Sequence, residues 1–175
     1  MDESTRGKLL VATPMVGDFF HRTVVLMIEH SDEGAVGVVL NRPSEVLVAD
    51  AVPSLADAAG ADGLLHVGGP VATDSVLALG DFEDPGAAGT PVVGSIGLLD
   101  PEVLDAEIRR LRVYAGHAGW APGQLDGELE AGAWVVVDSQ PDDPFHEGDV
   151  WPIVLRREGG AYTLLSTMPE DPSLN

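Results

Sequence analysis

Apolar residues along this chain fall mostly into short runs of the length typical of β-strands. The run Thr23–His30 (TVVLMIEH) is nearly continuous and rich in β-branched residues, which predicts a strand buried on both faces. The run Ala35–Leu40 (AVGVVL) follows after Ser31–Gly34, whose residues favour a tight turn. The pattern therefore predicts a β-hairpin, and Lys8–Ala12 (KLLVA) predicts a strand before it.

Further apolar runs predict more strands, each bounded by Gly, Pro or Asp residues. These runs are Leu64–Val67, Val76–Leu79, Val92-Val93 with Ile96–Leu99, and Ala133–Asp138. The acidic segment Asp81–Gly89 between two of them is expected to be a mobile loop.

Three segments have helical spacing. Residues 46–59 predict a helix interrupted at Pro53, and Val150–Arg157 predicts a last helix. The strongest signal begins at Asp100, an N-cap residue followed by a proline at the first helical position. Its apolar stripe consists of Val103, Leu104, Ile108 and Leu111.

The segment Val113–Trp134 combines more residue types with special roles than any other part of the chain. It predicts a buried strand, a glycine-rich turn carrying Trp120, a short amphipathic helix that ends near Gly132, and the start of a strand. A glycine turn before a helix directs backbone N–H groups toward a bound anion. The alternative is that the glycines only allow close packing beneath Trp120.

Strands outnumber helices in this prediction, and several neighbouring strands are joined by hairpins. This pattern favours an α+β fold with a mixed sheet over a doubly wound α/β fold. No internal repeat or linker composition divides the chain, so residues 1–175 are expected to form a single domain.

The charge balance argues against nucleic-acid binding. The chain has 9 basic and 29 acidic residues and a formal net charge of −20, and Pro43–Ile108 contains no Lys or Arg. Such a surface repels phosphate backbones. Two basic clusters are expected near helix C-termini: Arg109, Arg110 and Arg112 form one, and Arg156 and Arg157 the other.

The sequence contains no cysteine, no signal peptide and no apolar run long enough to cross a membrane. It therefore predicts a cytoplasmic protein without membrane association.

Motifs of common enzymes are absent from the sequence. It lacks the GxSxG, HExxH, GxGxxG and GxxxxGK[ST] patterns, and its histidines (His21, His30, His66, His117 and His146) are scattered. No metal or cofactor is predicted. His30 and His66 are interpreted as structural, hydrogen-bonded residues, and Asp142 and Asp143 as part of a solvated turn, with a cation site as the alternative.

The remaining polar residues suggest an anion site. Arg22 and Thr23 precede one hairpin strand, while Asn41 and Arg42 follow its partner, so both pairs lie at one end of the hairpin. Two arginines there could hold a carboxylate or phosphate, or instead neutralise Asp18 or Glu45. Backbone donors would come from Gly68, Gly69, Gly119, Gly123 and the helix start at Gln124. The hypothesis is that these residues converge with the arginines on one pocket, and the alternative is that they lie on separate faces and serve only in packing.

Four stretches in this order resemble the AlgH/YqgE family of small bacterial proteins. They are Pro14–His30 with Gly34–Pro43, then Leu65–Val71 (LHVGGPV), Gly116–Leu129 (GHAGWAPGQLDGEL) and Gly132–Phe145 (GAWVVVDSQPDDPF). The resemblance implies a compact domain with a strongly bent mixed β-sheet. The family is described as uncharacterised or, on genetic grounds, as transcriptional regulators. His117 departs from its pattern, where an aromatic residue is expected.

Together these observations predict a non-enzymatic binding domain that acts as an accessory or regulatory factor without contacting DNA directly. Its partner would be another protein or a small anionic ligand, and the chain itself would be a monomer or weak homo-oligomer. The alternative is a hydrolase or transferase that acts on a small phosphorylated or carboxylated substrate.

Overall fold

The computed structural model describes residues 4–100, 102–103 and 106–167. They form an α+β architecture built on a ten-stranded sheet, whose main path runs in the order β10-β1-β2-β3-β9-β6-β8-β7. The described strand pairs are antiparallel except that of β5 with β9. The strands are β1 Lys8–Ala12, β2 Val24–Ser31, β3 Gly34–Val39, β4 Pro43–Leu47, β5 Leu64–Val67, β6 Val71–Phe82, β7 Thr90–Val93, β8 Ile96–Leu98, β9 Ile108–Trp120 and β10 Trp134–Asp138.

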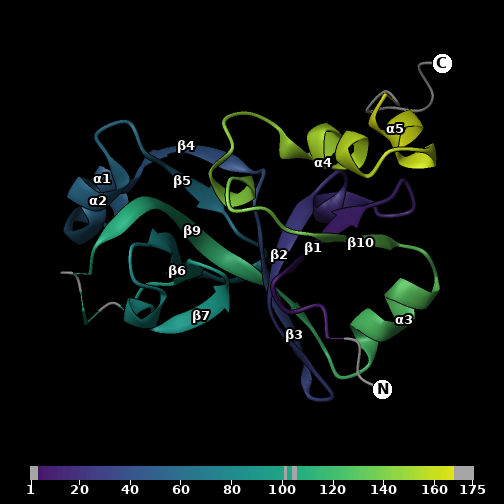
Figure 1. The fold of residues 1–175 in the computed structure, drawn as a ribbon, viewed down its shortest axis with the longest axis horizontal. Helices are drawn as coiled ribbons and strands as arrows, with labels where there is room; N and C mark the ends of the chain where they lie inside the picture. The colour runs from purple at the N-terminus through teal and green to yellow at the C-terminus, as the bar shows by residue number, and fades with distance from the viewer. Residues whose placement is uncertain (1–3, 101, 104–105, 168–175) are drawn as a thin grey trace.

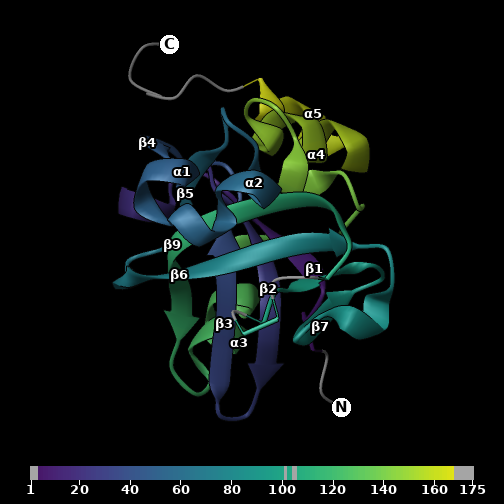
Figure 2. The same ribbon diagram turned by 90° about the vertical axis from the view of Figure 1, so that its left-hand side faces the viewer.

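The helices cover the two halves of this sheet separately. Figure 1 shows α1 and α2 at the end where β9 begins, and α3, α4 and α5 around β1, β2 and β10. Their bounds are α1 Val48–Ala51, α2 Ala56–Ala59, α3 Gln124–Glu130, α4 Val150–Glu158 and α5 Ala161–Ser166. Turned by 90°, the structure shows β6 and β9 crossing the direction of β2 and β3, so the sheet is bent (Figure 2).

Several predicted elements are confirmed. Strand β1 has the predicted bounds, and β2 and β3 form the predicted hairpin, in which Val25 lies opposite Val39. Helix α4 begins after Asp149, whose Oδ1 accepts a hydrogen bond from the backbone N–H of Trp151 at 3.0 Å. The interrupted helix predicted at 46–59 is confirmed only from Val48, as α1 and α2 on either side of a 3₁₀ turn at Pro53–Leu55; Val46 and Leu47 belong to strand β4.

The helix predicted from Asp100 is wrong, because none of its described residues is helical. Ile108 and Leu111 lie in β9, opposite Phe82 and Gly80 of β6. The Asp100 side chain does accept a hydrogen bond from the N–H of Glu102 at 2.9 Å, but this closes only a local turn. Pro101 and Leu104 lie outside the described residues. Long-range pairing with β6 decides the conformation here over a local helix-start signal.

Two further predictions, one of a loop and one of a strand, were incomplete. The predicted loop at Asp81–Gly89 begins inside β6, where Asp81 and Phe82 are buried, and contains a 3₁₀ turn at Pro85–Ala87. The single strand expected from Val92 to Leu99 is a pair of short antiparallel strands, β7 and β8.

The predicted glycine-rich turn before Trp120 is also a strand, because β9 continues to Trp120. The glycines instead allow the chain entering β6 to cross β9 at close range. A Cβ atom placed on Gly69 would lie 2.1 Å from the carbonyl carbon of His117, and one on Gly116 would lie 2.4 Å from the oxygen of Gly69. Gly116 also has a φ of +74°, which favours glycine.

Helix α3 closes over an aromatic cluster on one face of the β1–β3 half. Trp120 and Trp134 are 8% and 6% exposed, and their rings meet edge to face. Their indole N–H groups donate hydrogen bonds to the same Glu128 oxygen, at 3.0 and 2.9 Å. Phe20 packs against both rings. Trp120 is therefore a core residue, as predicted.

The opposite face of this half is covered by α4. Trp151 is 2% exposed, and its indole N–H donates to the carbonyl oxygen of Ala12 at 2.9 Å. Val154 and Leu155 belong to the same buried cluster as Leu9 and Leu26 from β1 and β2. Each face of the β1–β2–β3 sheet thus has its own core.

Candidate functional site

A cleft of about 850 Å³ lies beside the first half of β9. One wall consists of the segment between α2 and β5 together with His66 of β5, and the other consists of the segment from Phe145 to Asp149. Residues Arg109 to Val113 of β9 line the cleft between these walls. Because three segments distant in sequence meet here, the cleft is a product of the fold and not of one loop.

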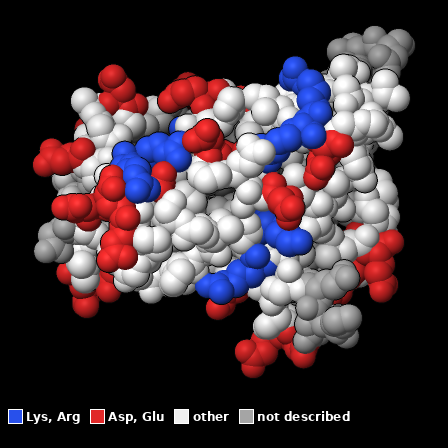
Figure 3. All heavy atoms as spheres, viewed as in Figure 1, with Lys and Arg blue, Asp and Glu red and all other residues white. Residues whose placement is uncertain are grey.

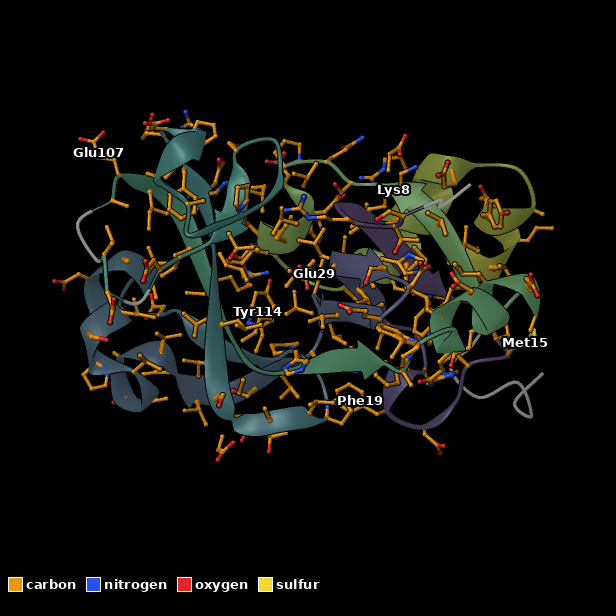
Figure 4. The ribbon with its side chains drawn as sticks, turned by 90° about the horizontal axis from the view of Figure 1, so that it is seen from below. Lys8, Met15, Phe19, Glu29, Glu107 and Tyr114 are labelled. Atoms are coloured by element: carbon orange, nitrogen blue, oxygen red, sulfur yellow. The ribbon has the colours of Figure 1, made fainter. Side chains whose placement is uncertain are left out.

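Strand register determines which side chains meet on this face of the sheet. Arg110, Arg112 and Tyr114 alternate along β9 and therefore share one face. His66 of β5 is the Cα partner of Tyr114 in the parallel pair, and their rings lie edge to face at 5.7 Å. Tyr114 is fully buried and lies near the centre of the molecule in Figure 4. His66 and Arg112 are thus diagonal neighbours, since Arg112 precedes the partner of His66 by two residues on the same face.

Arg109 and Arg110 are held by carboxylates. Both bind the buried Asp81, at 3.2 and 2.8 Å, while Arg109 also binds Glu83 and Arg110 binds Asp142. Burial alone would raise the pKa of Asp81, but hydrogen bonds from Ser95 and Arg110 and the two guanidinium charges lower it below its usual value. The expectation that these arginines stabilise a helix C-terminus was wrong, since they lie on a strand.

Arg112 is bound differently. Its Nη1 donates to the carbonyl oxygens of Pro144 at 2.8 Å and His146 at 3.2 Å. In the described part of the chain, no carboxylate lies within ion-pair distance of it, and its Nε and Nη2 groups have no hydrogen-bond partner. Since Arg112 lines the cleft, it brings two unused donors and a positive charge without a direct carboxylate partner to this site.

His66 has an unused acceptor in the same cleft. The ring is 7% exposed, and Nδ1 lies 3.1 Å from the carbonyl oxygen of Leu64. A carbonyl can only accept, so Nδ1 carries the proton and Nε2 has a free lone pair. Burial, followed by the charge of Arg112, lowers the pKa of His66 to about 4, so the ring is neutral at pH 7.

The wall from Phe145 to Asp149 is anchored at both ends. Arg157 of α4 binds both oxygens of Asp143 at 2.9 Å, and Asn41 donates to Asp149 at 2.8 Å. Asp143 is only 5% exposed, so the predicted solvated turn is corrected to a buried ion pair at this residue. Asp57, Asp62 and Glu147 line the cleft as exposed residues, which gives it an acidic rim.

The predicted cluster at the end of the hairpin exists. Asn41 is 8% exposed; its Oδ1 accepts from the N–H of Val24, and its Nδ2 donates to the carbonyl oxygen of Arg22. The Arg22 guanidinium stacks 4.1 Å above the Trp151 ring, and Arg42 donates to the carbonyl oxygens of Asn41 and His21. Thr23 is buried and donates to the carbonyl oxygen of Phe20. Of these residues, Asn41 also lines the cleft.

The predicted glycines do not join this cluster as one site. Gly68 accepts from the N–H of Val39, near Asn41, and Gly69 lies against the backbone of His117. Gly119 lies opposite Val36 in the sheet, while Gly123 and Gln124 begin α3, next to Trp120. Trp120 pairs with Ala35 at the start of β3, whereas Asn41 follows its end. The predicted residues are therefore distributed over both ends of the hairpin.

Sequence reasoning missed Arg112 and His66 as partners. The signal was the alternation of Arg110, Arg112 and Tyr114, which is a strand pattern, but the helix signal at Asp100 obscured it. Only the parallel pairing of β5 with β9 brings His66 to Arg112, and sequence does not reveal that register. His30 is bound as predicted, to Thr5 and Asp126.

Figure 3 shows Lys and Arg side chains in separate groups, each bordered by Asp or Glu side chains. Among the described residues, no group of three His, Asp or Glu side chains is arranged to hold a metal ion. None of the helices in the described ranges combines the length and apolar character that a membrane crossing requires.

Comparisons with known proteins agree on one family. The profile described as AlgH-like matches residues 9–163. A UPF0301 protein of Streptomyces coelicolor is 48% identical over 98% of this chain and 96% of its own length, and one from Mycobacterium tuberculosis is 40% identical over 97% and 90%. The fold matches a crystal structure from Corynebacterium diphtheriae with a TM-score of 0.84 and 34% identity, covering 93% and 91% of the chains. It also matches the solution structure of the AlgH protein from Pseudomonas aeruginosa, with a TM-score of 0.73 and 26% identity over 97% and 96%. This chain belongs to the AlgH-like family, whose function is not established.

Proposed function

We propose that this protein is a non-enzymatic binding domain that takes a small anionic ligand into the cleft beside β9 and acts as a cytoplasmic accessory or regulatory factor. The observation that carries the proposal is Arg112. It is a cation on the floor of a cleft, it is fixed by two backbone carbonyls, and it has no carboxylate partner among the described residues.

The chemistry of Arg112 favours a carboxylate or phosphate ligand. Nε and one Nη of a guanidinium form a planar pair of donors that matches two anionic oxygens. The bonds from Nη1 to Pro144 and His146 leave that pair free and restrict the side chain's rotation. A pre-oriented cation loses little conformational entropy when a ligand binds. The cleft volume of about 850 Å³ is ample for a metabolite-sized molecule.

The cleft supports binding better than the alternative of a hydrolase or transferase. Its described lining contains no Ser, Thr, Cys or Lys that could serve as a nucleophile. His66 is in position to act as a base, but a ring with a pKa of about 4 is a weak proton acceptor at neutral pH. A regulatory role through direct DNA contact is disfavoured by the net charge of −20.

The test begins with native mass spectrometry of gently purified protein to find a co-purified acid. Binding of carboxylates and phosphates is then measured by NMR titration for the parent, Arg112→Gln and Arg156→Gln. Arg156 lies on α4 with its Nε bound to Pro152, so its variant removes a cation of equal charge outside the cleft. We expect Arg112→Gln to lose binding and Arg156→Gln to retain it. Equal affinity in the parent and the Arg112 variant would refute the proposal.

A further inference from the structure

We infer that His66 determines the specificity of the β9 cleft, and that it selects organic anions carrying a hydroxyl group close to the acidic group. This inference rests on the proposed function, because it presumes that Arg112 holds the acidic group. It adds a second point of recognition, which a carboxylate or phosphate alone would not satisfy.

His66 carries its proton on Nδ1. The Leu64 carbonyl oxygen, 3.1 Å from Nδ1, requires the proton to be on that nitrogen. Nε2 is therefore only an acceptor, and no described residue donates a hydrogen bond to it. His66 is 7% exposed and lines the cleft, and its Nε2 is open to water, because no buried side-chain nitrogen or oxygen among the described residues lacks a hydrogen-bond partner. A ligand donor in the cleft can replace that water and make the hydrogen bond itself.

His66 and Arg112 face the same cleft from two paired strands. His66 lies opposite Tyr114 in the parallel β5–β9 pair, and Arg112 precedes Tyr114 by two residues on the same face of β9. The Arg112 guanidinium is also close enough to His66 for its charge to act on the imidazole ring. Both residues line the same cleft. A ligand whose acidic group meets Arg112 thus places nearby atoms beside His66.

The ligand group that suits His66 beside Arg112 is an uncharged hydrogen-bond donor. Arg112 and His66 together present a positive charge and a neutral acceptor to the ligand. A hydroxyl group donates to the neutral ring and carries no charge, so Arg112 does not repel it. An ammonium group would also donate, but it would lie next to the Arg112 guanidinium, and like charges repel. The arrangement therefore favours hydroxy acids over amino acids and over simple acids.

The experiment uses pairs of acids that differ by one hydroxyl: lactate and propionate, L-malate and succinate, citrate and tricarballylate. Each is titrated into ¹⁵N-labelled full-length protein, and the His66 Nε2 resonance is followed in long-range ¹H–¹⁵N spectra. We expect at least one hydroxy acid to bind about three- to tenfold more tightly than its partner, the effect of one hydrogen bond. Its binding should shift Nε2 in the direction of an accepted hydrogen bond.

Two variants separate this inference from the proposed function. His66→Phe keeps an aromatic ring against Tyr114 but has no acceptor, whereas His66→Gln restores an amide oxygen. We expect the preference to disappear in the first variant and to return in part in the second. If both acids of every pair bind equally and depend on Arg112, the role of His66 is refuted and the proposed function stands. If no acid binds in an Arg112-dependent way, both are refuted.

Discussion

Glu128 offers a sensitive test of how the aromatic core is held. One of its oxygens accepts hydrogen bonds from Trp120 and Trp134, and the other accepts from Gln124 at 3.0 Å. In Glu128→Ala both indole N–H groups lose their partner while the rings remain buried. Hydrogen bonds to a charged group contribute about 1.5–3 kcal/mol each, and a half-buried carboxylate belongs at the lower end.

The expected loss of unfolding free energy is therefore about 2–4 kcal/mol. For a chain of this size that corresponds to a decrease in melting temperature of about 5–15 °C. Urea unfolding followed by far-UV circular dichroism measures it. Glu130→Ala is the matched control, because Glu130 is exposed on the same helix and has no hydrogen bond to a described residue.

Glu128→Gln adds a graded step, since the amide oxygen accepts without a negative charge, and its stability should fall between those of the parent and Glu128→Ala. Unfolding free energies of Glu128→Ala and Glu130→Ala that agree within about 0.5 kcal/mol would refute this role of Glu128. That result would mean that water replaces the carboxylate without cost, and that ring packing alone holds the cluster.

Further measurements test other parts of the structure. Trp120→Ala should cost about 3–5 kcal/mol of stability, and a melting temperature equal to the parent's would contradict its core role. Asp143→Asn leaves Arg157 without its buried carboxylate and should cost about 2–4 kcal/mol. Asp142→Asn, on an 88% exposed side chain, should cost less than about 1 kcal/mol, so equal losses would argue against the buried pair. His66 titrates near pH 4 when folded and near 6.5 when unfolded, so stability should fall as the pH is lowered from 6.5 to 4; His66→Phe should reduce that slope, and an unchanged slope would refute the shift. In fluorescence anisotropy, duplex DNA should not bind at physiological salt; sub-micromolar, salt-sensitive binding would overturn this.

The sequence was sufficient where local patterns and long-range contacts agree. The β2–β3 hairpin has continuous apolar strands and a turn of suitable residues, and both features are local. Helix α3 likewise follows from Leu125, which is buried, and from Gly132, which has a φ of +81° beyond its end. Such elements are predictable because their own residues favour the conformation that the core requires.

Prediction failed where distant partners decide the outcome. Ile108 and Leu111 are three residues apart and fit a helical stripe, yet β6 supplies a continuous antiparallel partner that extends them into β9. The site was missed for the same reason. Arg112 becomes a cleft residue only because β5 pairs in parallel with β9, and because the segment after Pro144 folds over it. Neither the pairing of β5 with β9 nor the position of the segment after Pro144 can be predicted from the residues near Arg112.

The central position of β9 also shapes the order in which the protein can fold during synthesis. β9 pairs with β3, β5 and β6, all of which precede it in the chain. Until residues 108–120 leave the ribosome, β3, β5 and β6 each have an edge without its native partner. The edge of strand β1 remains unpaired for longer still, because its partner β10 begins only at Trp134. At translation rates of about 5–20 residues per second, these edges stay unpaired for seconds, and during that time they are open to pairing with the wrong strand or with another chain.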